Sequence, residues 1–172
     1  DTELVLMGGK MFNFDNCNEY PSISLHDAII TEVVLTRDMI TLVFDDKGFT
    51  LFDNSRENVK EMGTAGAKLH IHRLQPEYEF EKLEEVFISS DHYIRHKHSF
   101  SVSKPISIEK LAENVNSGRW SLEIICELHA CSSIELRGLI RTKKRYGFND
   151  SFMLYIIYSG SLSYEWESVF EW

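Results

Sequence analysis

The sequence predicts a mainly β fold, in which eight to ten antiparallel strands and one helix form a meander, a sandwich or a curled sheet. Apolar and polar residues alternate along most of the chain, which is the pattern of strands with one buried face. Short polar connections separate these segments. Helical spacing is clear at about 107–117, and we expect this helix to cover one side of the sheet.

The segment 23–53 predicts three consecutive strands. Its first part, residues 23–35, has apolar residues spaced by two or a multiple of two, which places them on one strand face: Ile23, Leu25, Ile29, Val33 and Leu35. Residues 39–44 alternate in the same way. The loop at 45–48 is typical of a hairpin, because Asp can bond its own backbone and Gly48 can take a positive φ.

The middle of the chain gives a weaker signal. Residues 54–66 mix polar side chains with two glycines, which predicts a loop, with one helical turn at 57–62. Residues 67–74 predict a strand with Leu69 and Ile71 facing inward. The segment 77–88 fits a strand or a helical stripe, and we favour the strand. Alternation from 92 to 102 predicts one further strand.

The helix and the last strands have clear boundaries. Ser107 is a suitable N-cap, Gly118 stands where a C-terminal cap belongs, and an apolar stripe lies between them: Ile108, Leu111, Ala112 and Val115. The next strand, 121–131, has an alternating inner face: Leu122, Ile124, Cys126, Leu128 and Ala130. Further strands are expected at 134–142, 152–158 and 162–166.

Length and charge restrict the class of protein. The 172 residues are expected to form a single domain, 1–172, with a core that needs neither metal nor disulfide. A net charge of −9 disfavours nucleic acid and anionic membranes and favours a basic protein partner. The start of the chain resembles no secretory leader, and no apolar run is long enough to span a membrane.

The cysteines favour a reducing compartment. Cys17, Cys126 and Cys131 are odd in number and show no CxxC spacing, which argues against a disulfide framework and a zinc knuckle. We therefore expect a cytoplasmic protein.

Histidines provide the clearest candidate for a metal site. His70 and His72 would lie on one strand face, roughly 6 to 7 Å apart, a spacing that two ligands of one divalent metal can use. With Glu77 they form an HxH-x4-E pattern that resembles the first metal motif of the cupin family of metal-dependent enzymes. The glycine expected seven residues later is replaced by Glu84, and His98 or His129 would have to complete the site. Exposed strand histidines without a ligand are the alternative interpretation.

The pair His26-Asp27 resembles the metal-binding His-Asp pair of the phosphohydrolases named for it. In that family the pair lies among helices, whereas here it falls in an expected strand, so we reject a metal role for it. On a strand, Asp27 would share the apolar face and would need hydrogen-bond donors. It is therefore a candidate for fixing a neighbouring loop.

Several features together resemble a group of small bacterial proteins of uncharacterised function, some of which are immunity proteins of polymorphic toxin systems. These features are Leu25-His26-Asp27 before a meander, Trp120 opening a long strand, Gly138 in the next strand, and the closing Tyr164-Glu165-Trp166. No single family is indicated. The resemblance implies an intracellular protein that neutralises a toxin by binding it.

The leading hypothesis is therefore a non-enzymatic protein that binds a basic partner through acidic and aromatic residues. The candidate partner-binding residues are Glu79, Glu81, Glu84, Glu85, Glu165, Trp166 and Glu167. No cofactor is expected under this hypothesis. The alternative is a cupin-like metal-dependent enzyme or metal-binding protein that uses His70, His72 and Glu77. A carrier of a small ligand, with a pocket between sheets, is a third possibility.

Overall fold

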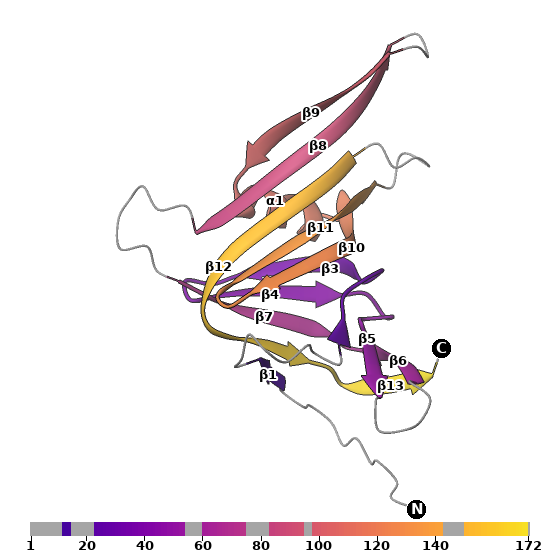
Figure 1. Ribbon diagram of the computed structural model, residues 1–172, viewed down its shortest axis with the longest axis vertical. Helices are drawn as coiled ribbons and strands as arrows, with labels where there is room; N and C mark the ends of the chain where they lie inside the picture. Colours follow the sequence, from indigo (N-terminus) through magenta and orange to yellow (C-terminus); the bar gives the residue numbers. More distant parts are fainter. Residues whose placement is uncertain are drawn as a thin grey trace, which may run out of the picture.

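The computed structural model describes residues 12–14, 23–53, 60–74, 83–94, 98–142 and 150–171. These residues form two antiparallel sheets, of nine and four strands, with one helix packed beside the larger sheet (Figure 1). The prediction of a mainly β fold with one helix is confirmed. None of the described helices has the length and apolarity required to cross a membrane.

The larger sheet contains β1 (Phe12–Phe14), β3 (Ile29–Leu35), β4 (Met39–Phe44), β7 (Lys68–Arg73), β8 (Glu84–Ile94), β9 (His98–Ile106), β10 (Trp120–Ala130), β11 (Ser133–Thr142) and β12 (Asp150–Glu165). The smaller sheet contains β2 (Ile23–Ser24), β5 (Thr50–Asp53), β6 (Lys60–Ala65) and β13 (Ser168–Glu171). The helix α1 spans Ile108–Asn116.

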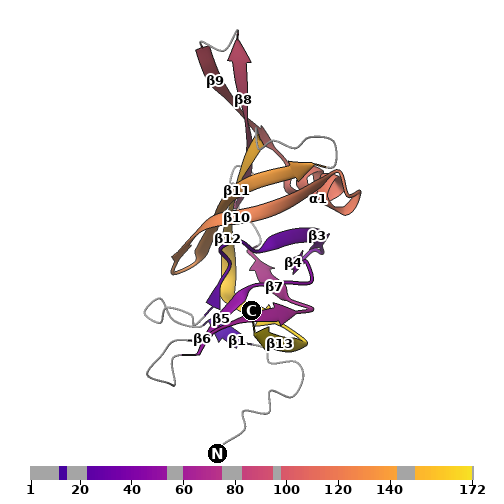
Figure 2. The same ribbon diagram turned by 90° about the vertical axis from the view of Figure 1, so that its right-hand side faces the viewer.

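The larger sheet curls because the two halves of β12 pair with different strands. The first half of β12 pairs with β8 and β11, and its second half pairs with β7 and β1. The change falls between Tyr158 and Leu162, where the register shifts. Gly160 lies at this bend with φ +74°, a conformation that side chains disfavour. The two parts of the sheet therefore face each other (Figures 1 and 2).

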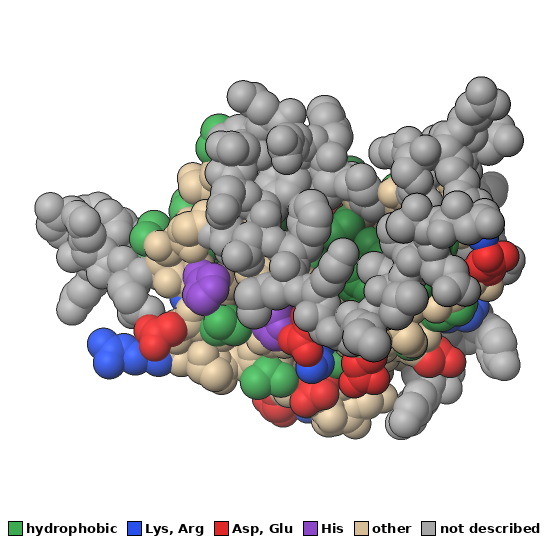
Figure 3. Space-filling view, turned by 90° about the horizontal axis from the view of Figure 1, so that it is seen from below, with side chains coloured by type: hydrophobic (Ala, Val, Ile, Leu, Met, Phe, Trp, Pro, Cys, Tyr) green, Lys and Arg blue, Asp and Glu red, His purple; other side chains and the backbone are tan. Residues whose placement is uncertain are grey.

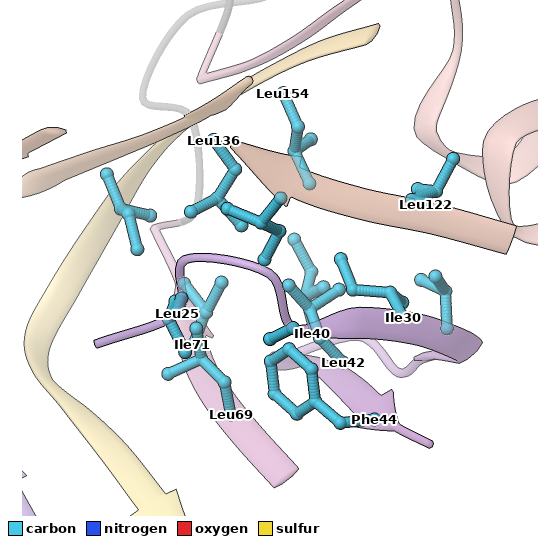
Figure 4. Packing of buried hydrophobic residues seen from close by; sticks show 14 of the residues in the cluster. Leu25, Ile30, Ile40, Leu42, Phe44, Leu69, Ile71, Leu122, Leu136 and Leu154 are labelled. Atoms are coloured by element: carbon cyan, nitrogen blue, oxygen red, sulfur yellow. The ribbon is translucent and has the colours of Figure 1, made fainter. Parts of the chain in front are cut away.

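The hydrophobic core fills the space between these two parts. Figure 4 shows Leu122, Leu136 and Leu154 on one side, pointing towards Ile40 and Leu69 on the other. All five side chains are fully buried. Strand β12 is apolar along its first half because it lies in the middle of the sheet, as the sequence predicts.

The helix forms as predicted. The Ser107 hydroxyl accepts a hydrogen bond from the Lys110 amide, and Gly118 follows the helix with φ +66°. The apolar stripe of α1 is buried against β3 and β10. Asn116 fastens the helix to β3, because its side-chain amide exchanges two hydrogen bonds with the backbone of Val33.

Two predictions in the first half of the chain are wrong. The expected strand 23–35 is divided into β2 and β3, which belong to different sheets. A bulge after Ile30 reverses the alternation, so that Ile30 is buried and Ile29 is partly exposed. The expected loop and helical turn are also wrong where they are described, because residues 60–65 form β6.

Two more corrections concern later strands. The segment 92–102 is not one strand, because β8 and β9 pair across a hairpin with Ile94 opposite His98. In β10, Leu122 and Ile124 are buried as predicted, but a register shift follows Ile124 and leaves Leu128 53% exposed. Residues 77–82, where a strand was favoured, lie outside the described residues.

Cys131 is disulfide-bonded, whereas Cys126 is free and exposed. The sequence argues against a framework of several disulfides, and it does not predict the single disulfide at Cys131. Cys17, the remaining cysteine of the sequence, lies outside the described residues.

Candidate functional site

A polar pocket of about 400 Å³ lies where the two sheets meet, and we call it the junction pocket. Its wall comes from the turn between β2 and β3, the loop between β4 and β5, and strands β6, β10 and β11. The charged or titratable side chains that line it are His26, Asp27, Lys47, Glu61, Glu123 and Arg141. It combines concavity with convergent polar groups, which is typical of ligand sites.

The turn that carries His26 and Asp27 has an unusual backbone. Asp27 has φ +65°, in the left-handed region, which costs energy for any residue other than glycine. Two hydrogen bonds to β10 hold it there: the Asp27 amide donates to Ile124 O at 2.8 Å, and the Ile124 amide donates to Ala28 O at 2.9 Å. Such backbone strain is concentrated at binding sites.

A partly buried carboxylate supports the same turn. Glu127 Oε1 accepts a hydrogen bond from the Leu25 amide at 2.8 Å, and Oε2 lies 3.0 Å from His129 Nε2. Glu127 lies on β10, so its side chain adds a further hydrogen bond between β10 and the turn. The role of Glu127 was not apparent from the sequence, because it depends on a contact with a residue more than 100 positions away.

Strands β10 and β11 contribute two opposite charges to the pocket, Glu123 and Arg141, which neutralise each other. Arg141 Nε donates to Glu123 Oε2 at 2.8 Å, and Arg141 Nη2 lies 2.7 Å from Glu123 Oε1. This two-point pairing with Glu123 raises the pKa of Arg141. Asp45 and Asp27 add to the negative potential at Arg141. Burial raises the pKa of the Asp45 carboxyl beside the pocket.

Among the described residues that line the pocket, the remaining charges are unbalanced. With Arg141 compensated by Glu123, the carboxylates of Asp27 and Glu61 face the single ammonium of Lys47. Asp27 Oδ2 lies 3.1 Å from His26 Nδ1, and both side chains are largely exposed. The pocket can therefore attract a cation, and its exposed groups remain accessible to one.

Only two of the three predicted metal ligands, His70 and His72, lie among the described residues. Both ring nitrogens of His70 already have partners: Nε2 lies 2.8 Å from Glu165 Oε2, and Nδ1 lies 3.0 Å from Thr41 Oγ1. His72 is exposed on the same strand, and Glu77 lies outside the described residues. No group of three or more His, Cys, Asp or Glu side chains within the described ranges could hold a metal ion.

The predicted partner-binding residues fall in different environments. Glu84 forms a two-point ion pair with Arg73 at 2.7 and 3.0 Å, and Glu165 binds His70 and Lys68. Glu167 is exposed and Glu85 is partly exposed, whereas Glu79 and Glu81 lie outside the described residues.

Trp166, also predicted to bind a partner, is buried. Its side chain is 7% exposed, and its ring packs edge-on against Phe49 with centroids 5.9 Å apart. Phe49 makes similar contacts with Tyr164 and Phe44. Trp166 therefore belongs to an aromatic cluster in the core.

Comparisons with known proteins found no relative of this chain. A scan against protein-family models found no match, and searches of curated proteins and of solved structures found none either.

Proposed function

We propose that the protein is a non-enzymatic binding protein that captures a basic protein partner, as the resemblance to immunity proteins implies. In this proposal the junction pocket receives a Lys or Arg side chain of the partner. The observation that carries it is a concave pocket in which, among the described residues, the carboxylates of Asp27 and Glu61 outnumber the ammonium of Lys47, in a chain of net charge −9.

The distribution of ion pairs supports the proposal. Many basic side chains are neutralised within the molecule, among them Lys60, Lys68, Arg73, Arg119 and Arg141. Exposed carboxylates remain without an ion pair in the described part of the chain, including Glu32, Asp46, Glu61 and Glu167. Figure 3 shows acidic side chains more often than basic ones along the lower rim of the face seen from below. Such an excess accelerates association with a basic protein.

The pocket suits the end of one cationic side chain. A guanidinium group binds carboxylates through paired hydrogen bonds, and the Asp27 and Glu61 carboxylates are acceptors for them. The strained Asp27 backbone fixes the position of one acceptor before the partner arrives, which lowers the entropic cost of binding.

The resemblance and the disulfide point to different compartments. The resemblance implies an intracellular protein, whereas the disulfide at Cys131 argues against a reducing environment. The metal-dependent alternative, with His70, His72 and Glu77 as ligands of a divalent metal, is not favoured by any described contact.

A random peptide library displayed on phage tests the proposal. Peptides selected on the wild-type protein should be enriched in Lys and Arg. The variant Glu61→Lys should weaken their binding at least tenfold, which corresponds to about 1.4 kcal/mol. Glu109→Lys is the matched control, because it makes the same change in net charge at an exposed position on α1, away from the pocket. Its affinity should stay within about twofold of wild type.

Two outcomes would contradict the proposal. One is selection of peptides without an excess of basic residues. The other is an equal loss of affinity in Glu61→Lys and Glu109→Lys, since this would show a response to net charge rather than to the pocket.

A further inference from the structure

The hairpin of β8 and β9 extends beyond the rest of the larger sheet. Strand β8 pairs with β12 only over residues 84–90, whereas its pairing with β9 continues to Ile94 opposite His98. The outer part of the hairpin, residues 91–94 and 98–101, thus has no other strand beside it in the described structure. Figures 1 and 2 show this hairpin as an arm that stands away from the body.

Strand β9 forms the open edge of this arm. It is nine residues long, and among the described strands it pairs with β8 alone. The pairing runs without a bulge from Val86 opposite Ile106 to the end of the hairpin. Residues 101–105 are exposed, and Val102 is 45% exposed.

Pro105 shows which backbone groups of β9 point outward. Proline has no amide hydrogen, so within a sheet it is placed where its nitrogen faces away from the neighbouring strand. In a regular strand the amide and carbonyl of alternate residues point to the same side. The backbone groups of Ser99, Ser101 and Ser103 therefore point away from β8, as does the carbonyl of Pro105.

The usual protection of a sheet edge is absent along most of β9. Natural edge strands carry charged side chains, prolines or bulges that prevent pairing with another chain. In β9 Lys104 and Pro105 are near the base of the arm, whereas the sequence of residues 98–103 contains no Lys, Arg, Asp, Glu or Pro. Within the described part of the chain, no strand pairs with the outward backbone groups of this stretch.

We propose that β9 pairs antiparallel with β9 of a second copy of this chain, about a two-fold axis at Val102. This register places Ser101 opposite Ser103 of the other copy, and each such pair exchanges two backbone hydrogen bonds. Lys104 falls opposite position 100, so no two like charges meet across the interface.

The geometry of the arm reduces charge repulsion between the two copies. Because the two β9 strands run in opposite directions, the two bodies lie at opposite ends of the shared ribbon. The nearest strands of the two bodies, the two copies of β12, would be five strand spacings apart across the ribbon, about 24 Å, which is about three times the Debye length of about 8 Å at physiological salt. The net charge of −9 on each body is therefore screened from the other. This inference is independent of the proposed function, since the junction pocket is not part of the arm.

Cysteine crosslinking tests the register. In a Cys126→Ser background, Val102→Cys should form a covalent dimer under mild oxidation, because the residues on the axis would have Cα atoms about 4.5 Å apart. Lys104→Cys is the matched control, since it is exposed on the same strand. Its two copies would lie about 13 Å apart, too far for a disulfide. Non-reducing electrophoresis should show at least five times more covalent dimer for Val102→Cys.

Sedimentation velocity tests the pairing itself. The variant Ser103→Pro removes an outward amide without disturbing the pairing with β8, and it should raise the dimer dissociation constant at least tenfold. Ser103→Thr keeps the amide and should dimerise like wild type, and circular dichroism confirms that both variants fold. The proposal is overturned if the wild type stays monomeric at millimolar concentration, or if the two cysteine variants crosslink equally.

Discussion

Two histidine–carboxylate pairs of this molecule have the same chemistry and different surroundings. His70 and Glu165 lie on neighbouring strands β7 and β12, and the His70 side chain is 16% exposed. His26 and Asp27 are adjacent in the chain, at the rim of the junction pocket, and the His26 side chain is 58% exposed. The first pair is enclosed in a hydrogen-bond network with Thr41 and Lys68, whereas the second is open to solvent.

The difference shows that residue type alone does not identify a site. The sequence suggests His70 as a metal ligand and gives His26 no role. The structure places His70 among protein partners that occupy both ring nitrogens and places His26 beside a pocket. A side chain whose partners are already satisfied contributes to stability, whereas an accessible one remains available for a ligand.

The largest effect is expected from removing each histidine in turn. His70→Ala leaves Thr41 without its side-chain partner and Glu165 with Lys68 alone in a partly buried network, so the free energy of unfolding should fall by about 1 to 3 kcal/mol. His26→Ala removes an exposed side chain and should change it by less than about 0.5 kcal/mol. Urea denaturation followed by circular dichroism measures both values. Equal effects would contradict the distinction between the two pairs.

A smaller effect is expected from the strained backbone of the second pair. Asp27→Gly should be more stable than Asp27→Ala by about 1 kcal/mol, because alanine keeps the cost of the left-handed conformation and glycine does not. At Asp38, which is exposed and has no positive φ, the same two substitutions should give the opposite order. Thermal unfolding of the four variants provides the comparison. If glycine were the less stable residue at both positions, the strain at Asp27 would not be significant.

The smallest effect is expected in the pH dependence of the first pair. The hydrogen bond from His70 holds the pKa of Glu165 below its ordinary value of 4.5; Lys68 acts in the same direction, and burial opposes them. A carboxyl group with a lowered pKa in the folded state stabilises it above pH 4.5, and this contribution is lost as the pH falls through the folded-state value.

The variant Glu165→Gln isolates this contribution. Near neutral pH it should be less stable than wild type by less than about 1 kcal/mol, since the carboxyl is about one third exposed. The difference should shrink when urea denaturation is repeated below pH 4.5. A difference that is constant with pH would show that the ionised carboxylate is not the stabilising form.

The sequence predicts those parts of the fold that depend on local signals. Ser107 and Gly118 mark the ends of the helix because caps act on the adjacent turn. Prediction fails at Ile30 and after Ile124, because a bulge shifts the alternation by one residue and is set by the partner strand. It also fails for β6, whose residues form a strand through pairing with β5 and β13.

The junction pocket is harder to predict than any strand. Its charged residues come from five separate segments, and each of them alone is typical of a solvated surface. The sequence does identify Asp27 as a residue that fixes a loop, but the structure gives a different cause: its backbone, rather than its carboxylate, is bonded to β10. Predicting the pocket would require the strand order in advance.

The disulfide at Cys131 couples this fold to the redox state of its surroundings. Reducing that bond takes up two electrons, so the ratio of bonded to open protein changes tenfold for each change of about 30 mV in the ambient potential. Glutathione in a cytosol would compete for the bond, whereas an oxidising environment would preserve it. A chain without this bond would lack its constraint on the unfolded state, so its stability should differ from that of the bonded chain.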